Sequence, residues 1–532
     1  MIRRRQFLGG AAALAGASMS YGLTRRASAQ DSSKVLKFVP QADLAVVDPF
    51  GSPAYVTRNH AMMVYDTLYG VDSNFKAQPQ MVEGHTTESD DKIWKMTLRP
   101  GQKFHDGEPV LGKDVAASLK RWLGQDSFSQ ALAPFVDEIS APDDKTVQFR
   151  LNKPFPMLPD ALGKVNPRST GIMPERIAAA DPTKPITEII GSGPFRYVAA
   201  ERVAGSLNVY EKFADYIPRS EAADNLAGGK VVHFDRVEWH TIPDPATAAA
   251  ALQAGEIDWW EQPTPDLLQA FTGNSDIRVA VTDKTGNLGI LRFNFLQKPF
   301  DNPQIRKILL NVVRQSDFLI AAVGEDPSMW QAPVGIFHPN AELASTEGLE
   351  TFTKTPDLEK AKADLIAAGY KGERVVIIST GDYPVIGAFS EVAADLFRKV
   401  GLNVDLQVQD WATVAQRMKN KGDLDSGGYS VYCNFIAGAA IYNTAGYSYL
   451  RSNADKAFDG WPDIPEIEVL RAEWLSSTNA AERPEIGRKI QQIALEKVPF
   501  VPLGLFYYPT AYRSDLTGML DAMPLFWNVR RA

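Results

Sequence analysis

One stretch in the second half of the chain restricts the possible folds more than any other. Residues 375–379 form a short run of mostly β-branched apolar side chains, which is typical of a buried strand. A helical pattern then runs to about Val400, Gly401 ends it, and a second strand is predicted over residues 402–408. A strand, a helix and a strand of these lengths form a parallel unit with a right-handed connection. The chain is therefore predicted to contain an α/β domain.

Further elements are predicted on both sides of this unit. Asn302 can cap a helix that starts with Pro303, whose missing N–H costs nothing there, and Thr355-Pro356 repeats the pattern for a helix ending near Gly369. Earlier segments contain more turns and favour mixed or antiparallel pairing, with strands at 93–98 and 146–151 and a helix at 113–122. No low-complexity linker is present, so we expect domains joined by short crossing strands that permit hinge motion.

The first 29 residues have the three parts of an export signal. Arg3, Arg4 and Arg5 are followed by a 15-residue run of small and apolar residues and then by a small-residue cleavage site, residues 27–29. The stretch Arg4 to Leu8 resembles a twin-arginine signal. The alternative is a membrane anchor, but the run falls short of the ~20 residues that span a bilayer. No cysteine lies at the cleavage site, so we expect an exported, lipid-free protein cleaved near Ala29 and located in the periplasm.

Composition excludes several classes of function. The net charge is −8, and no clustered basic face predicts nucleic-acid binding. Cys433 is the only cysteine, the six histidines are scattered, and the sequence contains no P-loop, G-x-S-x-G, H-E-x-x-H or C-x-x-C motif. We therefore predict that the protein is not an enzyme and has no cofactor and no metal site. A secreted hydrolase is the main competing interpretation, and a periplasmic chaperone on the same scaffold is a third.

Aromatic residues near glycine-rich loops are candidates for a ligand pocket. Trp260 and Glu261 follow a predicted helix, Trp411 follows the strand that ends at Val408, and the segment 427–435 combines two glycines with three aromatic residues. Aromatic rings with a few amides typically line pockets for small ligands, although any one of them can equally be core. Strand alternation would put Tyr432 and Asn434 on one face of that segment, and only one face can meet a ligand.

Several motifs, taken together and in order, resemble those of the family 5 extracellular solute-binding proteins, which bind peptides, opines and nickel for ABC importers. The segment FHDGEPVLGKDVAASLKRW at 104–122 is similar to the family signature. The other similar stretches are Val47-Asp48-Pro49, Tyr65 to Leu68, GSGPF at 191–195, QAGEID at 253–258, and Asn294 with QKPFDNPQIRKIL at 297–309. The resemblance covers essentially the whole chain after the export signal.

The resemblance implies a three-domain periplasmic binding protein-like α/β fold (class II, cluster C), with two lobes around a hinged ligand cleft. Domain I would comprise residues 30–76, 191–285 and 498–532, domain II residues 77–190, and domain III residues 286–497. The ligand, a small organic solute, would lie between domains I and III. The implied partners are an inner-membrane ABC permease and its ATPase subunits, and the protein would be a monomer. A nickel-chelate receptor of the same family is the alternative ligand class.

The resemblance also implies which residues contact the ligand. Peptide-binding relatives hold the ligand's α-ammonium with an aspartate, and the best matching position here is Asn434, which cannot supply that charge. Glu261 can replace the charge from the other lobe. The predicted ligand-binding residues are Tyr55, Trp260, Glu261, Asn287, Trp411, Tyr429, Tyr432, Asn434 and Phe435.

The exported protein is expected to begin at or near Gln30, because cleavage follows the small residues at 27–29. N-terminal sequencing of protein from the periplasmic fraction measures this directly. A mature chain that retains Arg3 to Arg5 would contradict the interpretation.

Overall fold

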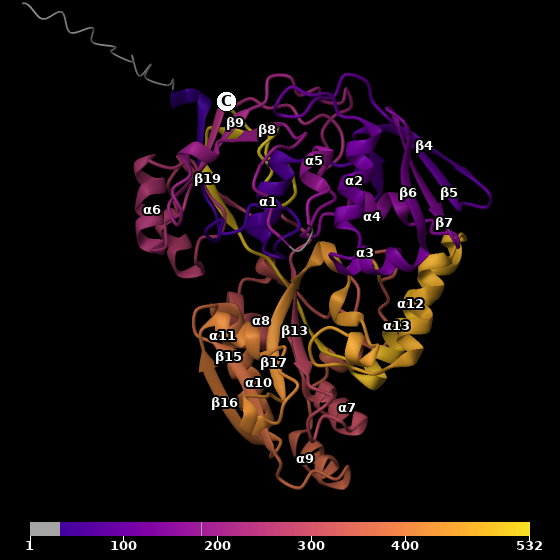
Figure 1. The fold of residues 1–532 in the computed structure, drawn as a ribbon. Coiled ribbons are helices and arrows are strands. Elements are labelled where there is room, and N and C mark those ends of the chain that lie inside the picture. Colours follow the sequence, from indigo (N-terminus) through magenta and orange to yellow (C-terminus); the bar gives the residue numbers. More distant parts are fainter. Residues whose placement is uncertain (1–31, 182–183) are drawn as a thin grey trace, which may run out of the picture.

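The computed structural model describes residues 32–181 and 184–532, and the predicted export signal lies outside these ranges. The molecule consists of two lobes (Figure 1). The first half of the chain and its C-terminal end build the upper lobe, and residues from about 287 to 506 build the lower lobe.

A seven-stranded mixed sheet forms the centre of the upper lobe. In spatial order its strands are β12 (Ile277–Ala280), β19 (Thr510–Arg513), β11 (Trp259–Trp260), β1 (Val35–Val39), β10 (Arg236–His240), β9 (Leu207–Lys212) and β8 (Phe195–Tyr197). The central strand β1 pairs in parallel with both β10 and β11. Helices α1 (Tyr55–Val64) and α6 (Pro245–Ala254) also belong to this lobe.

A four-stranded antiparallel sheet lies at one side of the upper lobe, beside several short helices (Figure 1). Its order is β4 (Val82–Glu88), β5 (Ile93–Leu98), β7 (Thr146–Leu151) and β6 (Val136–Asp143). The accompanying helices are α2 (Gly112–Trp122), α3 (Ser127–Leu132), α4 (Leu158–Gly163) and α5 (Glu175–Ala178). The predicted strands at 93–98 and 146–151 and the helix at 113–122 are confirmed.

The lower lobe is built on a six-stranded sheet. Its order is β14 (Trp330–Gln331), β18 (Val501–Phe506), β13 (Asn287–Phe293), β17 (Val431–Ala437), β15 (Arg374–Thr380) and β16 (Asn403–Gln409). The helices are α7 (Pro303–Val312), α8 (Gln315–Val323), α9 (Leu358–Ala367), α10 (Pro384–Lys399), α11 (Trp411–Arg417), α12 (Pro465–Ser476) and α13 (Arg483–Lys497). The remaining strands, β2 (Tyr69–Val71) with β3 (Ala77–Pro79) and β20 (Leu516–Thr517) with β21 (Arg530–Arg531), form two-stranded ribbons.

The parallel unit that restricts the fold is present. Strands β15 and β16 pair in parallel in continuous register, with α10 between them in sequence. Asn302 caps α7 as predicted, with its side chain accepting from the Gln304 N–H. The cap of α9 differs from the prediction. The helix begins two positions later, at Leu358, and Asp357 rather than Thr355 caps it by accepting from the Lys360 N–H.

The chain passes between the lobes twice, at residues 281–286 and at residues 507–509. The first passage coincides with the predicted boundary at 285. The second begins ten residues after the predicted boundary at 497, since β18 is buried along its whole length and pairs with β13 in the lower lobe. We call residues 281–286 and 507–509 the two crossovers, and the assignment of three domains around them stays a proposal.

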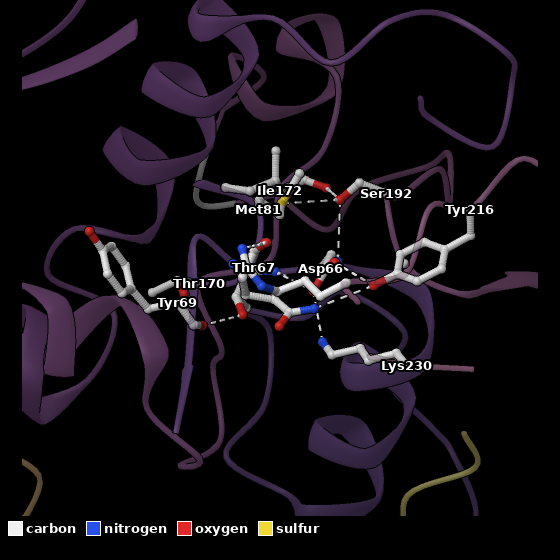
Figure 2. Close-up of polar contacts among 12 residues, drawn as sticks. Asp66, Thr67, Tyr69, Met81, Thr170, Ile172, Ser192, Tyr216 and Lys230 are labelled. Atoms are coloured by element: carbon white, nitrogen blue, oxygen red, sulfur yellow. Dashed lines mark hydrogen bonds and ion pairs between the residues drawn. The ribbon is translucent and has the colours of Figure 1, made fainter. Parts of the chain in front are cut away.

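A buried ion pair connects separate segments of the upper lobe (Figure 2). The Lys230 ammonium lies 2.7 Å from Oδ1 of Asp66, and both side chains are at most 2% exposed. Tyr216 donates its hydroxyl proton to Oδ2 of the same carboxylate, and the Thr67 N–H donates to Oδ1. Asp66 lies two residues after the end of α1. This network therefore fixes the C-terminal end of α1 against residues 216–230.

Replacing Lys230 by methionine is expected to destabilise the protein by about 3–5 kcal/mol, because the Asp66 carboxylate would stay buried without its cation. The matched control is Lys95→Met in the exposed Lys95–Glu88 pair, whose loss should cost less than about 1 kcal/mol. Chemical denaturation followed by far-UV circular dichroism measures both. Equal, small shifts in the two variants would show that the buried pair contributes no more than a surface pair.

Candidate functional site

A cavity of about 60 Å³ lies where the two crossovers join the lobes, and we call it the crossover cavity. Its walls come from α1, from the end of β11, from both crossovers, from the lower-lobe strands β13 and β17, and from the C-terminal segment. The lining residues are Gln41, Tyr55, Arg58, Glu261, Gln262, Thr282, Asp283, Asn287, Phe435, Ala437, Tyr508, Thr510, Met523 and Pro524.

Helix α1 supplies an aromatic ring and a cation to this cavity. Tyr55 and Arg58 are three residues apart and therefore share a face of the helix. The guanidinium carbon of Arg58 lies 4.8 Å from the centre of the Tyr55 ring, an arrangement favourable for a cation–π contact. Every residue of α1 after Tyr55 is buried, so the helix has little freedom to move away from the cavity.

Asn59 connects the cation to a buried carboxyl group. Its side-chain oxygen accepts from Nε and Nη2 of Arg58 at 3.2 and 3.0 Å, and its amide donates to Oε1 of Glu261 at 3.1 Å. The backbone N–H of Gln41 donates to Oε2 of Glu261 at 2.8 Å. Arg58 and Glu261 are each only 6% exposed. The network therefore holds two groups of opposite formal charge in the wall of one cavity.

Burial shifts the pKa of both Glu261 and Arg58. Desolvation raises the pKa of Glu261 to about 7, although the Gln41 N–H, Arg58 and Asn59 all favour the charged form. Desolvation lowers the pKa of Arg58, and Tyr55, Asp283 and Glu261 oppose that shift. Because arginine starts from a very high value, Arg58 stays a cation at neutral pH. Glu261 takes up or releases a proton close to neutrality.

Aromatic rings from both lobes form the remaining wall. Phe435 on β17 contacts Tyr508 of the second crossover edge-on, with ring centres 6.3 Å apart. The Tyr55 hydroxyl oxygen accepts the N–H of Ala437 at 3.0 Å, which joins α1 to β17 across the lobes. Since that oxygen is used as an acceptor, the phenolic proton of Tyr55 is free to be donated into the cavity.

Four of the nine predicted ligand-binding residues line this cavity: Tyr55, Glu261, Asn287 and Phe435. Trp411 does not line the cavity but is connected to its wall through Tyr383. Its ring is 5.5 Å from that of Tyr383, which is in turn 6.4 Å from Phe435. Trp411 begins α11, directly after its cap Asp410, at the carboxyl end of the parallel strand β16, the end where it was expected.

The other four predicted residues are not among those that line the cavity, and their role as ligand contacts stays a prediction. Trp260 is buried in a small apolar cluster with Phe271 and Ala511. Tyr429 and Tyr432 are fully buried and contact each other edge-on in the lower-lobe core. The Asn434 amide donates to the Tyr449 hydroxyl at 3.0 Å. Phe435, one position further along β17, faces the cavity because alternate side chains point to opposite faces.

Sequence reasoning missed Arg58, Asp283 and Tyr508. Arg58 could have been predicted, because it lies about one helical turn after Tyr55, which is one of the predicted ligand-binding residues. Asp283 and Tyr508 belong to the crossovers, where no periodic pattern marks which side chains face inward. Within residues 32–181 and 184–532, no group of three or more His, Cys, Asp or Glu side chains is placed to hold a metal ion.

Comparison with known families and structures gives the context of this site. The family model for bacterial extracellular solute-binding proteins, family 5, middle part, matches residues 76–453. The chain belongs to this family. The predicted class, a solute-binding protein with the α/β fold of periplasmic binding proteins, is thereby confirmed.

Individual relatives agree with the family assignment. A probable peptide ABC transporter periplasmic-binding protein of Sinorhizobium fredii is 36% identical over all of this chain and 99% of its own length. The solved structure of the binding protein AgaA with agropinic acid, from Agrobacterium tumefaciens R10, has a TM-score of 0.78 at 23% identity and covers 94% of this chain and 99% of that one. The Helicobacter pylori protein DppA with the peptide STSA has a TM-score of 0.77 at 21% identity, covering 93% and 98%. At these identities the two structures establish the fold.

The raised pKa of Glu261 predicts a pH dependence of stability. In the unfolded chain this carboxyl ionises near pH 4.5, whereas in the folded protein it keeps its proton until about pH 7. The folded state binds more protons between these values, so the free energy of unfolding should fall by on the order of 3 kcal/mol as the pH rises from about 4.5 to 7. In Glu261→Gln this contribution is absent, and its melting temperature should fall less between pH 5 and pH 8 than that of the unaltered protein.

The change with pH, not the absolute melting temperature, is the measurement that matters, because glutamine also disturbs the bonds from Asn59 and Gln41. Glu83→Gln, at an exposed position on β4, is the matched control and should keep the original pH dependence. Parallel pH profiles for the unaltered protein and Glu261→Gln would show that Glu261 ionises normally.

Proposed function

We propose that the protein is the periplasmic substrate-binding component of an ABC importer, and that it binds a small zwitterionic, peptide-like or opine-like solute in the crossover cavity. The observation that carries the proposal is the pair Arg58 and Glu261, buried in the wall of one cavity and connected through Asn59. A buried cation and a buried carboxylate are both costly unless they are paired, and a ligand with both charges satisfies them together.

Each polar group has a role in this proposal. Arg58 has N–H donors beyond those directed to Asn59, and these donate to the ligand carboxylate, for which a guanidinium fork is well suited. Glu261, in its ionised form, and Asp283 bind the ligand ammonium. Tyr55 donates its phenolic proton, and the rings of Phe435 and Tyr508 cover the apolar part. Glu261 of the upper lobe thereby supplies the carboxylate that is absent at position 434, where the chain has asparagine.

The relatives support this class of ligand. The printed name of the Sinorhizobium fredii relative is that of a probable peptide-binding protein, and a 24% identical relative from Pectobacterium atrosepticum is named a glutathione-binding protein. Agropinic acid and the peptide STSA are the ligands in two structures with the same fold. A peptide carries a carboxylate, which matches a cavity containing an arginine.

In the proposed cycle the protein is an exported monomer that closes on its solute and delivers it to a membrane permease with ATPase subunits. No covalent chemistry is part of the proposal. None of the helices in residues 32–181 and 184–532 is long and apolar enough to cross a membrane. The nickel-chelate alternative predicts stoichiometric metal in gently purified protein, which elemental analysis measures.

Arg58→Met is expected to reduce the capture of peptides from a tryptic casein digest by at least tenfold, because the ligand carboxylate loses its partner. The protein is incubated with the digest, desalted, denatured, and the released solutes are identified by mass spectrometry. The matched control is Arg398→Met at the exposed end of α10, which should capture the same solutes as the unaltered protein. Undiminished capture by Arg58→Met would remove Arg58 from the site, and no capture by the unaltered protein would reject a peptide-like ligand.

A further inference from the structure

A second cavity of about 220 Å³ adjoins the crossover cavity, and we call it the distal cavity. The two cavities share Asp283 and Met523 as wall residues. The upper lobe contributes Ser73 and Asn225, among others, and the lower lobe contributes Tyr442. The distal cavity is therefore enclosed only when the two lobes are together.

Asn225 is an unusual group in the wall of the distal cavity. Its side chain is 6% exposed, and its Oδ1 atom accepts no hydrogen bond from any residue that the structure describes. A buried acceptor without a donor costs free energy, so buried polar groups of this kind are normally paired. Asn225 also has a left-handed backbone, with φ of 54°, which asparagine and glycine adopt more readily than other residues.

The loop that carries Asn225 is held firmly. The Ser73 N–H donates to Oδ1 of Asp224 at 3.0 Å, and the Leu226 N–H donates to the carbonyl of Val71. These contacts dock the loop on the ribbon formed by β2 and β3. The unpaired oxygen of Asn225 is thus presented by a fixed backbone and not by a loose surface turn.

Aromatic residues close the distal cavity between the lobes. Phe75, at the tip of the same ribbon, stacks on Tyr442 with ring centres 3.9 Å apart, and Tyr442 stacks on His338 at 4.4 Å. Asp283 lies between the two cavities, and its Oδ1 accepts from the N–H and the hydroxyl of Thr285. The wall of the distal cavity thereby combines apolar faces with several polar groups, among them the unpaired Asn225 oxygen, the Asp283 carboxylate and the Lys284–Asp521 ion pair.

We propose that the distal cavity binds the far end of the ligand and selects solutes with a third polar group, an N–H donor such as an amide or an ammonium. The group would donate to Oδ1 of Asn225, while the carboxylate and α-ammonium of the same ligand occupy the crossover cavity. This inference rests on the proposed function. It narrows the ligand class to zwitterions extended by a side chain or second residue that carries N–H donors.

The test uses six dipeptides in equimolar mixture: Ala-Gln, Ala-Lys, Ala-Met and their reversed sequences. Methionine has a length similar to glutamine but donates no hydrogen bond from its side chain. Bound dipeptides are released after desalting and quantified by mass spectrometry. The unaltered protein is expected to retain Gln- or Lys-containing dipeptides at least tenfold over those with Met, because Met leaves the Asn225 oxygen unpaired.

Two substitutions separate the role of the side chain from that of the backbone. Asn225→Gly keeps the left-handed backbone but removes the acceptor, so the preference over Met should disappear. Asn225→Asp keeps an acceptor and adds a negative charge, so the preference over Met-containing dipeptides should persist. If the natural group is an ammonium, the preference should shift towards Lys-containing dipeptides. If it is an amide, the retention of Gln-containing dipeptides should weaken. Melting temperatures of both variants show that the proteins are folded.

The outcomes distinguish the two proposals. An unchanged preference in Asn225→Gly, or equal retention of Met-containing dipeptides by the unaltered protein, rejects the distal subsite and leaves the crossover cavity as proposed. Retention of none of the six dipeptides by the unaltered protein rejects the dipeptide-like ligand class and the distal subsite with it.

Discussion

The Asp66–Lys230 ion pair is the interaction on which the geometry of the upper lobe depends. It lies almost completely out of water, and Tyr216 and the Thr67 N–H each donate a further hydrogen bond to the carboxylate. A buried pair is worth little for stability compared with apolar packing, but it tolerates only one arrangement of its partners. Since Asp66 follows α1 so closely, the orientation of the helix that carries Arg58 and Asn59 is set at this point.

The two lobes use buried arginines in different ways. In the lower lobe Arg292 is fully buried and donates to the backbone carbonyls of Tyr449, Phe458, Asp459 and Pro499, so its side chain joins four loop positions. In the upper lobe Arg58 bonds one side-chain oxygen and otherwise faces a cavity. Every side-chain nitrogen of Arg292 donates to a backbone carbonyl, whereas Arg58 keeps N–H donors that can bind a solute. This difference is why one arginine is a structural element and the other a candidate binding residue.

Sequence patterns predicted those parts of the fold where a local rule decides the outcome. The parallel unit of β15, α10 and β16 follows from apolar runs and a glycine stop, and the cap at Asn302 follows from its neighbour Pro303. The lobe to which β18 belongs was not predictable from residues 498–506, because a strand that is buried on both faces has the same apolar sequence pattern in either sheet. The site was predicted in part for a related reason. Tyr55 and Phe435 line the cavity, whereas Asn434 lies on the opposite face of β17 from Phe435, and alternation alone does not show which face meets the cavity.

The position of the cavity at the two crossovers has a mechanical consequence. Thr282 and Asp283 on one crossover and Tyr508 on the other are wall residues and also part of the only two peptide connections that join the lobes in the described chain. Rotation of the lobes therefore displaces the walls of the cavity directly, without any intermediate element. The Tyr55–Ala437 hydrogen bond and the Phe75–Tyr442 stack break in the same rotation, since each joins one lobe to the other. Opening of the cavity and loss of these interlobe contacts are therefore coupled to the same movement.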